Sequence, residues 1–158
     1  MFSRLDYGSA TLAGLPKQLM DKLQSVQNAD ARLIFKACHQ DHIQPLLHRL
    51  RWLRMPERVS FRLAVQVYRC LHGSVPGYLA SDLQRVSHLN ARRRLRSSTT
   101  SALVAPRTVR FTIGDCTFPE TAASVWSSLP ESVRSSPSLQ VFRSRLKTEL
   151  FARTYSHD

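Results

Sequence analysis

The sequence predicts a mainly α fold: a small helical assembly with a basic loop and a short β-hairpin before the two C-terminal helices. Apolar residues recur at spacings of three and four through much of the first half of the 158 residues, which is the period of amphipathic helices. A stretch without Asp or Glu follows, from Leu83 to Gly114, and an alternating apolar and polar segment lies near its end. The expected divisions are a helical region at 1–82, a basic flexible loop at 83–106, the hairpin and C-terminal helices at 107–151, and a tail at 152–158.

Two helices are expected in the first fifty residues, one from Pro16 to about Lys36 and a shorter one over 41–50. The first is expected to bury an apolar stripe made of Leu19, Leu23, Val26, Leu33 and Ile34. Its expected outer face carries Lys17, Asp21, Lys22, Gln24 and Arg32. Asp30 falls on the apolar stripe. Because a lone buried carboxylate is costly, Asp30 either meets an Arg or Lys from a neighbouring helix or weakens its own helix.

The third expected helix has the clearest ends. Pro56 suits the first helical position, Gly73 suits the left-handed residue beyond the last turn, and Pro76 prevents continuation. The apolar stripe consists of Val59, Leu63, Val67 and Leu71, with Phe61, Ala64 and Tyr68 beside it. The opposite side carries a polar stripe of Arg58, Arg62, Gln66 and Arg69. Such a stripe is either an ordinary solvated face or a surface that faces phosphates.

Arginines concentrate in the stretch from Leu83 to Gly114, which holds Arg85, Arg92, Arg93, Arg94, Arg96, Arg107 and Arg110. Residues 88–101 show neither a helical nor a strand period, so a flexible loop is expected there. We predict that phosphates are contacted by Arg92, Arg93, Arg94 and Arg96, with Arg107 and Arg110 in the same basic stretch. Arg58, Arg62 and Arg69 form a second predicted group.

A hairpin and two helices are expected after the loop. Val109, Phe111 and Ile113 alternate with polar residues, Gly114-Asp115 suits a turn, and Cys116 to Phe118 is the candidate return strand. Thr117-Phe118-Pro119-Glu120 matches a capping box for a helix that runs to about Ser128 and is anchored by Trp126 and Leu129. Ser136-Pro137 is expected to cap a last helix with the apolar face Leu139, Phe142, Leu146 and Leu150.

The net charge points to a polyanionic partner. Lys and Arg total 23 against 11 Asp and Glu, a formal charge of +12, and the pI is near 10.8. Nucleic acid is the leading partner for such an excess and an acidic membrane surface is the second. Arg greatly outnumbers Lys, and its planar fork of donors suits phosphates and base edges. No run of eighteen apolar residues and no secretory signal occur, so membrane insertion is not expected.

Enzyme signatures are missing from the sequence. There is no P-loop, no GxSxG, no HExxH and no pair of adjacent aspartates of the kind that two-metal polymerases use. No catalytic residue, cofactor or small-molecule ligand is therefore predicted. Cys38, His39, His42 and His48 are a possible zinc cluster, but their spacing matches no finger and we expect no metal. Three cysteines without CxxC spacing indicate a reducing compartment, and we expect an intracellular protein, nuclear or cytoplasmic.

The order of short motifs resembles a segment of non-LTR (LINE-type) retrotransposon polyproteins over about residues 5 to 151. The motifs that carry the resemblance include Leu12-Ala13-Gly14-Leu15-Pro16, Leu23-Gln24-Ser25-Val26-Gln27-Asn28-Ala29, Leu50-Arg51-Trp52-Leu53, Val67-Tyr68-Arg69-Cys70-Leu71-His72-Gly73, Pro76-Gly77-Tyr78-Leu79, Arg92-Arg93-Arg94-Leu95-Arg96-Ser97, Trp126-Ser127-Ser128-Leu129-Pro130 and Phe142-Arg143-Ser144-Arg145-Leu146-Lys147. Each motif is short, but the fact that all of them occur in the same order argues against coincidence.

The resemblance implies a thumb-like region and its extension, following the palm of a reverse transcriptase. The catalytic aspartates of such an RNA-directed DNA polymerase would lie upstream, so the chain would be a truncated C-terminal fragment without activity of its own. The implied role is to grip template or primer, RNA or DNA, through phosphates. The absent polymerase core would be the original intramolecular partner, and helices that packed on it would expose apolar surface.

Two other functions remain open from the sequence. The same arginines would serve a co-opted host module that binds RNA or DNA. Alternatively, the basic patch would meet an acidic protein partner. Salt-insensitive binding to a protein would favour the second of these, and a stable, expressed protein would favour the first.

Overall fold

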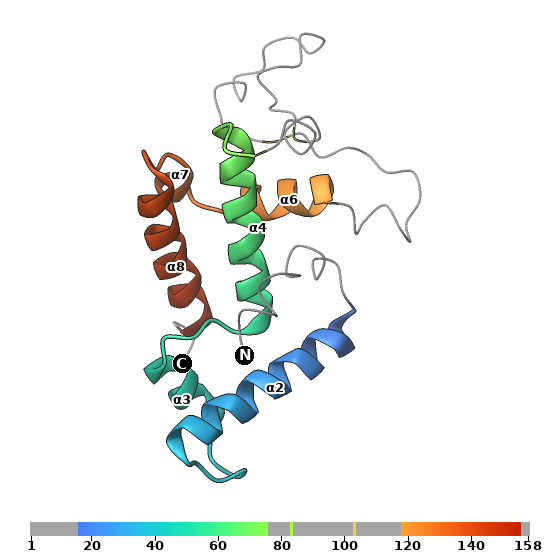
Figure 1. Cartoon of the computed structure of the whole chain (residues 1–158), viewed down its shortest axis with the longest axis vertical. Coiled ribbons are helices and arrows are strands. Elements are labelled where there is room, and N and C mark those ends of the chain that lie inside the picture. The colour runs from blue at the N-terminus through green and yellow to red at the C-terminus, as the bar shows by residue number, and fades with distance from the viewer. Residues whose placement is uncertain (1–15, 76–82, 84–102, 104–117, 156–158) are drawn as a thin grey trace.

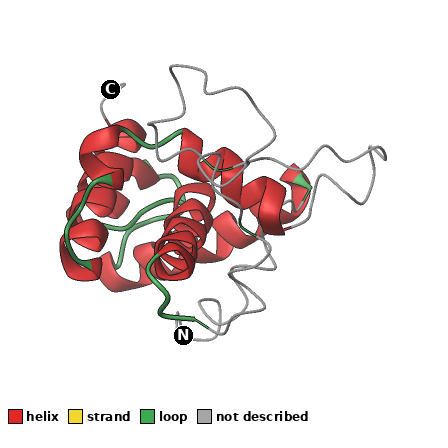
Figure 2. Ribbon diagram, turned by 90° about the horizontal axis from the view of Figure 1, so that it is seen from above, coloured by secondary structure: helices red, strands yellow, loops and turns green. Residues whose placement is uncertain are grey.

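The computed structural model describes residues 16–75, 83, 103 and 118–155, and this part of the chain is mainly helical, as predicted. The described residues form six helices and no strand (Figure 2). The helices are α2 (Lys17–Phe35), α3 (Ile43–Arg49), α4 (Met55–Leu71), α6 (Phe118–Ser127), α7 (Glu131–Arg134) and α8 (Leu139–Tyr155). None of them combines the length and apolarity needed to cross a bilayer. The predicted hairpin at 107–117 lies outside the described residues, and Phe118 already belongs to α6.

Helix α4 is the central element. It packs against α8 along its length, against α6 and, near its start, against α2 (Figure 1). Its predicted apolar stripe is confirmed, since Val59, Leu63 and Val67 are buried and Leu71 is half-buried. Ala64 and Tyr68 are buried as well. A helix in contact with three others buries residues on more than one face. Helix α4 therefore connects α2 with α6 and α8.

The core between α4, α6 and α8 is rich in stacked aromatic rings. The ring of Tyr68 stacks on Phe142 with centroids 4.4 Å apart, and Phe142 stacks on Trp126 at 5.8 Å. The hydroxyl of Tyr68 donates a hydrogen bond of 2.9 Å to the carbonyl of Ser136, which satisfies its only buried polar group. Phe142, Leu146 and Leu150 form the buried face of α8, as predicted.

Two positions of the predicted basic loop are described, and both are buried. Leu83 and Leu103 belong to the same hydrophobic core as Ala64, Trp126 and Phe142. The chain is therefore attached to the core on both sides of the arginine run at 92–96. Residues 84–102 and 104–117 lie outside the described part of the chain.

Three helices end in the same way. After α4 the amide of Ser74 donates to the carbonyl of Arg69 at 2.9 Å and that of Gly73 to Cys70, with Gly73 at a φ of 68°, as predicted for this glycine. This pair of bonds is the Schellman motif, which satisfies carbonyls that the helix leaves open. Lys36 after α2 and Arg51 after α3 occupy the equivalent position, at φ of 51° and 52°. A side chain with a Cβ is strained in that conformation.

Replacing Lys36 with glycine is expected to stabilise the chain by about 0.5–1 kcal/mol, because glycine adopts the left-handed conformation without steric cost. Lys36 is exposed, so little packing is lost. Urea unfolding at neutral pH measures the change, with Lys36→Ala as the matched control that keeps the strain. A Lys36→Gly variant no more stable than Lys36→Ala would contradict this explanation of the turn.

The predicted orientation of α2 is wrong, although its extent is confirmed. The buried residues of α2 are Gln27 and Ala31, whereas Leu19, Val26, Leu33 and Ile34 of the expected buried stripe are exposed. Gln24 was expected on the outer face. In the structure its Oε1 accepts a hydrogen bond of 2.8 Å from the amide of Met55.

A polar network decides this orientation. The buried amide of Gln27 donates to the carbonyl of Leu53 at 2.8 Å and accepts a bond of 3.1 Å from Gln24. Leu53 and Met55 lie at the start of α4, where backbone groups have no partner within the helix. Two glutamines of α2 supply those partners, and α2 therefore turns its amide-bearing side to α4.

The C-terminal end of α8 is hydrogen-bonded to the segment between α3 and α4. The Tyr155 hydroxyl donates a hydrogen bond of 2.8 Å to the carbonyl of Trp52, across 103 residues of sequence. The helix thus continues four residues into the segment expected to be a tail. Its start also differs, because the Ser138 hydroxyl accepts a bond from the Val141 amide, while the expected cap residue Ser136 is buried and bonds to Val133. The short α7 was not predicted.

Replacing Tyr155 with phenylalanine is expected to cost about 1 kcal/mol at pH 7 through the lost hydrogen bond. Burial raises the pKa of the Tyr155 hydroxyl above 10.0; Arg54 nearby opposes the rise and Glu57 adds to it. Above pH 10 the unfolded chain therefore loses this proton before the folded chain does, and folding stability falls. The stability difference between wild type and variant should shrink as pH rises beyond 10 in urea titrations. A difference that stays constant with pH would contradict the assignment.

Candidate nucleic-acid-binding surface

The three predicted arginines of α4 share one face of that helix. Arg58, Arg62 and Arg69 are four and seven residues apart, which places them within one narrow stripe. All three are half-buried, so the stripe is not an open solvated face. Arg58 and Arg62 each take part in an interaction within the chain. These two residues are therefore not free of partners within the chain.

The start of α4 concentrates further charge. Arg54 precedes the helix and Glu57 lies in its first turn, where a carboxylate is favoured by the helix dipole. One carboxylate oxygen of Glu57 is buried, and it accepts no hydrogen bond from the described residues. Both charges are close enough to Tyr155 to act on its pKa, in opposite directions. This end of α4 is an internal charge cluster beside the α8 terminus.

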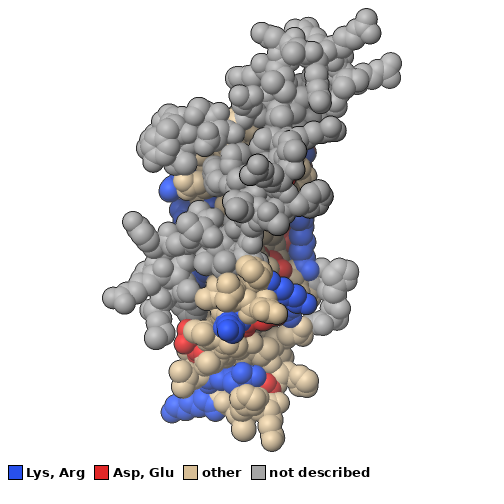
Figure 3. All heavy atoms as spheres, turned by 90° about the vertical axis from the view of Figure 1, so that its right-hand side faces the viewer, with Lys and Arg blue, Asp and Glu red and all other residues tan. Residues whose placement is uncertain are grey.

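Exposed cations on α8 extend the basic surface, and the sequence analysis left them out of the site. Arg143 and Lys147 are both exposed and lie four residues apart, so they project on the same side of the helix. Their position outside the apolar stripe was the available indication. Arg145, also exposed, donates to the carbonyl of Ser132 at 2.8 Å. Figure 3 shows the side of the molecule turned away from α8, where Lys and Arg side chains of the described part lie with Asp and Glu side chains between them.

Two further arginines form ion pairs within the chain. Arg134 pairs with Glu131 at 2.9 Å, and Arg153 pairs with Glu149 at 2.9 Å and also donates to the carbonyl of Ser128. Each pair joins two residues of the same helix, α7 for the first pair and α8 for the second. Such pairs at three or four residues contribute little stability, and they reduce the charge available to an outside anion.

The arginines predicted to be the main phosphate contacts lie outside the described residues. They are Arg92, Arg93, Arg94, Arg96, Arg107 and Arg110. The structure places none of them relative to the α4 stripe.

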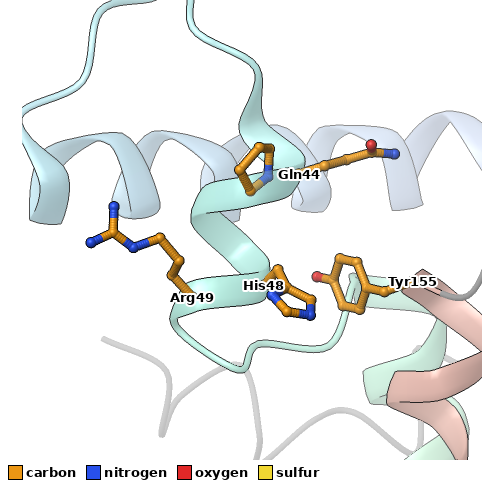
Figure 4. Close-up of a pocket in the computed structure, with 5 residues that line it drawn as sticks. Gln44, His48, Arg49 and Tyr155 are labelled. Carbon is orange, nitrogen blue, oxygen red and sulfur yellow. The ribbon is translucent and has the colours of Figure 1, made fainter. Parts of the chain in front are cut away.

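A shallow, open hollow lies between α3 and the end of α8 (Figure 4). Its lining residues are Gln44, Pro45, His48, Arg49 and Tyr155. The polar groups do not converge, since Arg49 points to the opposite side of α3 from His48 and lies over the Phe35 ring at 5.0 Å. The His48 ring is held between Phe151 and Tyr155, with centroids 5.1 and 5.2 Å away. These side chains connect α3 with α8 and do not form a ligand site.

The described residues form no candidate site for a metal ion or for a cysteine nucleophile. The described residues contain no group of three or more His, Cys, Asp or Glu side chains that could hold one metal ion. Cys38 is one of the four residues considered for zinc. Its backbone amide, and not its thiol, donates a hydrogen bond of 2.7 Å to the carboxylate of Asp41. Burial raises the pKa of the Cys70 thiol, which disfavours the reactive thiolate.

Comparison of this chain with known proteins assigns it to no family. No protein-family model, no curated protein and no solved structure matches this chain. The resemblance to non-LTR retrotransposon polyproteins therefore rests on the order of motifs in the sequence.

Proposed function

We propose that this chain is a nucleic-acid-binding helical piece of a non-LTR retrotransposon reverse transcriptase, which holds RNA or DNA through phosphates without polymerising. Binding is non-specific in sequence. The helical assembly serves as the support, and the basic stretch after α4 makes the principal contacts. The polymerase activity of the parent protein is assigned to a catalytic core outside these 158 residues.

The observation that carries the proposal is the separation of charge along the chain. Seven arginines and no carboxylate lie between Leu83 and Gly114, and two residues of that stretch, Leu83 and Leu103, are buried in the core. A concentrated positive segment attached to a folded support attracts polyanions and releases their counterions. The exposed Arg143 and Lys147 on α8 add further contacts of the same kind.

The distribution of acidic groups supports a role in binding rather than in polymerisation. Two-metal phosphoryl transfer needs carboxylates that hold two ions about 4 Å apart. The acidic residues of this sequence include no adjacent pair, and those in the described part are scattered over five helices and one turn. Two of them, Glu131 and Glu149, already pair with an arginine of their own helix.

A fourfold alanine variant tests the proposed contacts. Arg92, Arg93, Arg94 and Arg96 are replaced together, and binding to a single strand, a duplex and an RNA hairpin is followed by fluorescence anisotropy. We expect weaker binding to all three, with the slope of log K against log salt reduced by about 3. The control removes four exposed cations elsewhere, as Lys17→Ala, Lys36→Gly, Arg49→Ala and Arg51→Gly, and should weaken binding much less. Equal losses in the two variants would mean that only net charge matters, and an unchanged affinity would remove the loop from the proposal.

A further inference from the structure

Helix α2 carries an apolar face that the described residues leave uncovered. The exposed large hydrophobic side chains of the described part all lie on this helix: Leu19 is 43% exposed, Val26 48%, Leu33 76% and Ile34 55%. Leu19, Val26 and Leu33 are seven residues apart, so they form one line along the helix. Isolated exposed apolar side chains are ordinary, whereas a continuous line of them marks a contact surface.

The pattern along this line is that of a helix pairing seam. Leu23 and Asp30 fall between the three exposed residues, which gives spacings of four, three, four and three from Leu19 to Leu33. That period brings the same face of a helix to a neighbouring helix over several turns. Another side of α2 is already occupied, because Gln24 and Gln27 form hydrogen bonds with the start of α4 and Ala31 is buried. A second helix can therefore cover the seam without disturbing the fold.

Asp30 indicates which helix that is. It lies on the seam, and it makes no ion pair with any described residue. Lys22 lies four residues before Val26, and Asp30 lies four residues after it. An antiparallel copy of α2 with its two-fold axis at Val26 brings Asp30 of one chain opposite Lys22 of the other, and Leu33 opposite Leu19. A parallel copy would instead bring Asp30 opposite Asp30, which is unfavourable.

We infer that α2 is a self-association surface, on which a second copy of this chain docks antiparallel. The contact is isologous, so each of its charge pairs and leucine pairs occurs twice. It joins two basic chains through a face remote in sequence from the arginine run. The inference stands independently of nucleic-acid binding, since it rests on the exposed face of α2 alone.

The test is sedimentation of the full chain over a range of micromolar concentrations at moderate salt, where charge repulsion between basic chains is screened. We expect a monomer–dimer equilibrium. Val26→Glu should weaken it roughly tenfold or more, because a charge would be buried on the axis. The neighbouring Ser25→Glu adds the same charge on the exposed far side of α2 and should leave it intact. Circular dichroism checks that each variant stays helical.

A charge exchange tests the antiparallel register. Asp30→Lys alone and Lys22→Asp alone should each weaken the dimer, because like charges then face each other. The double variant should restore it. A chain that stays monomeric at every concentration would overturn the inference and leave the face to a different protein. A dimer insensitive to Val26→Glu, or a double variant that fails to restore association, would overturn it as well.

Discussion

Replacing Phe142 with alanine is expected to lower the free energy of unfolding by about 3–5 kcal/mol. The side chain is fully buried, and it stacks on both Tyr68 and Trp126. It joins α8 to α4 and α6, so its removal leaves a cavity where three helices meet. Small domains are stable by only about 5–15 kcal/mol, and a loss of this size removes a large part of the margin.

Urea unfolding followed by circular dichroism measures the effect of Phe142→Ala. Thr148→Ala is the matched control, because Thr148 is exposed on the same helix and should change stability by less than about 0.5 kcal/mol. Phe142→Leu should fall between the two. A loss below about 1 kcal/mol for Phe142→Ala would contradict the stacked core.

Replacing Gln27 with leucine is expected to cost about 2–3 kcal/mol, although the substitution makes a helix more hydrophobic. Gln27 is 1% exposed, and its amide is the donor to the carbonyl of Leu53. Leucine fills a similar volume but leaves that carbonyl without its partner, and the amide of Gln24 keeps only its bond of 2.8 Å to Asn28. A buried polar group without a hydrogen bond is destabilising even where packing is retained.

Gln18→Leu is the control for this second substitution, because Gln18 is exposed on the same helix. It should change stability by less than about 0.5 kcal/mol. If Gln27→Leu were as stable as the wild type, the junction of α2 with α4 would depend on apolar packing and not on the glutamine pair.

The helices whose burial follows hydrophobicity were predictable from the sequence. For α4 the apolar stripe, the left-handed Gly73 and the end near Leu71 are confirmed, and for α8 the face with Phe142 and Leu146 is confirmed. In each, the spacing of apolar residues and the residue with special backbone preference point to the same structure. The boundaries of α2 and α4 shift by one or two residues, which is the usual uncertainty of helix ends, whereas α8 ends four residues later than expected.

The orientation of α2 could not be predicted in this way. The choice between its faces depends on the open backbone groups at Leu53 and Met55, which exist only once α4 has begun nearby. In the structure Gln24 and Gln27 satisfy those groups. Hydrophobic periodicity alone assigns the leucine face to the core, and the exposed seam from Leu19 to Leu33 is the result.

The charge of the candidate site follows from the sequence, and the arrangement of its described arginines follows only in part. The common face of Arg58, Arg62 and Arg69 follows from their spacing, and the helix places them there. Their half-burial depends on neighbouring elements that the sequence does not reveal. Arg143 and Lys147 could have been included, since both lie outside the apolar stripe of α8 and four residues apart.

The most direct test of phosphate binding is the affinity of the unmodified chain for RNA and DNA across a salt series. With about five phosphate contacts, log K should fall against log salt with a slope of roughly −3.5 to −4.5. That result is expected for single strands and duplexes alike, with the shallower slope for single strands. No binding at low salt, or binding that salt does not weaken, would contradict the proposal that the chain holds nucleic acid through phosphates.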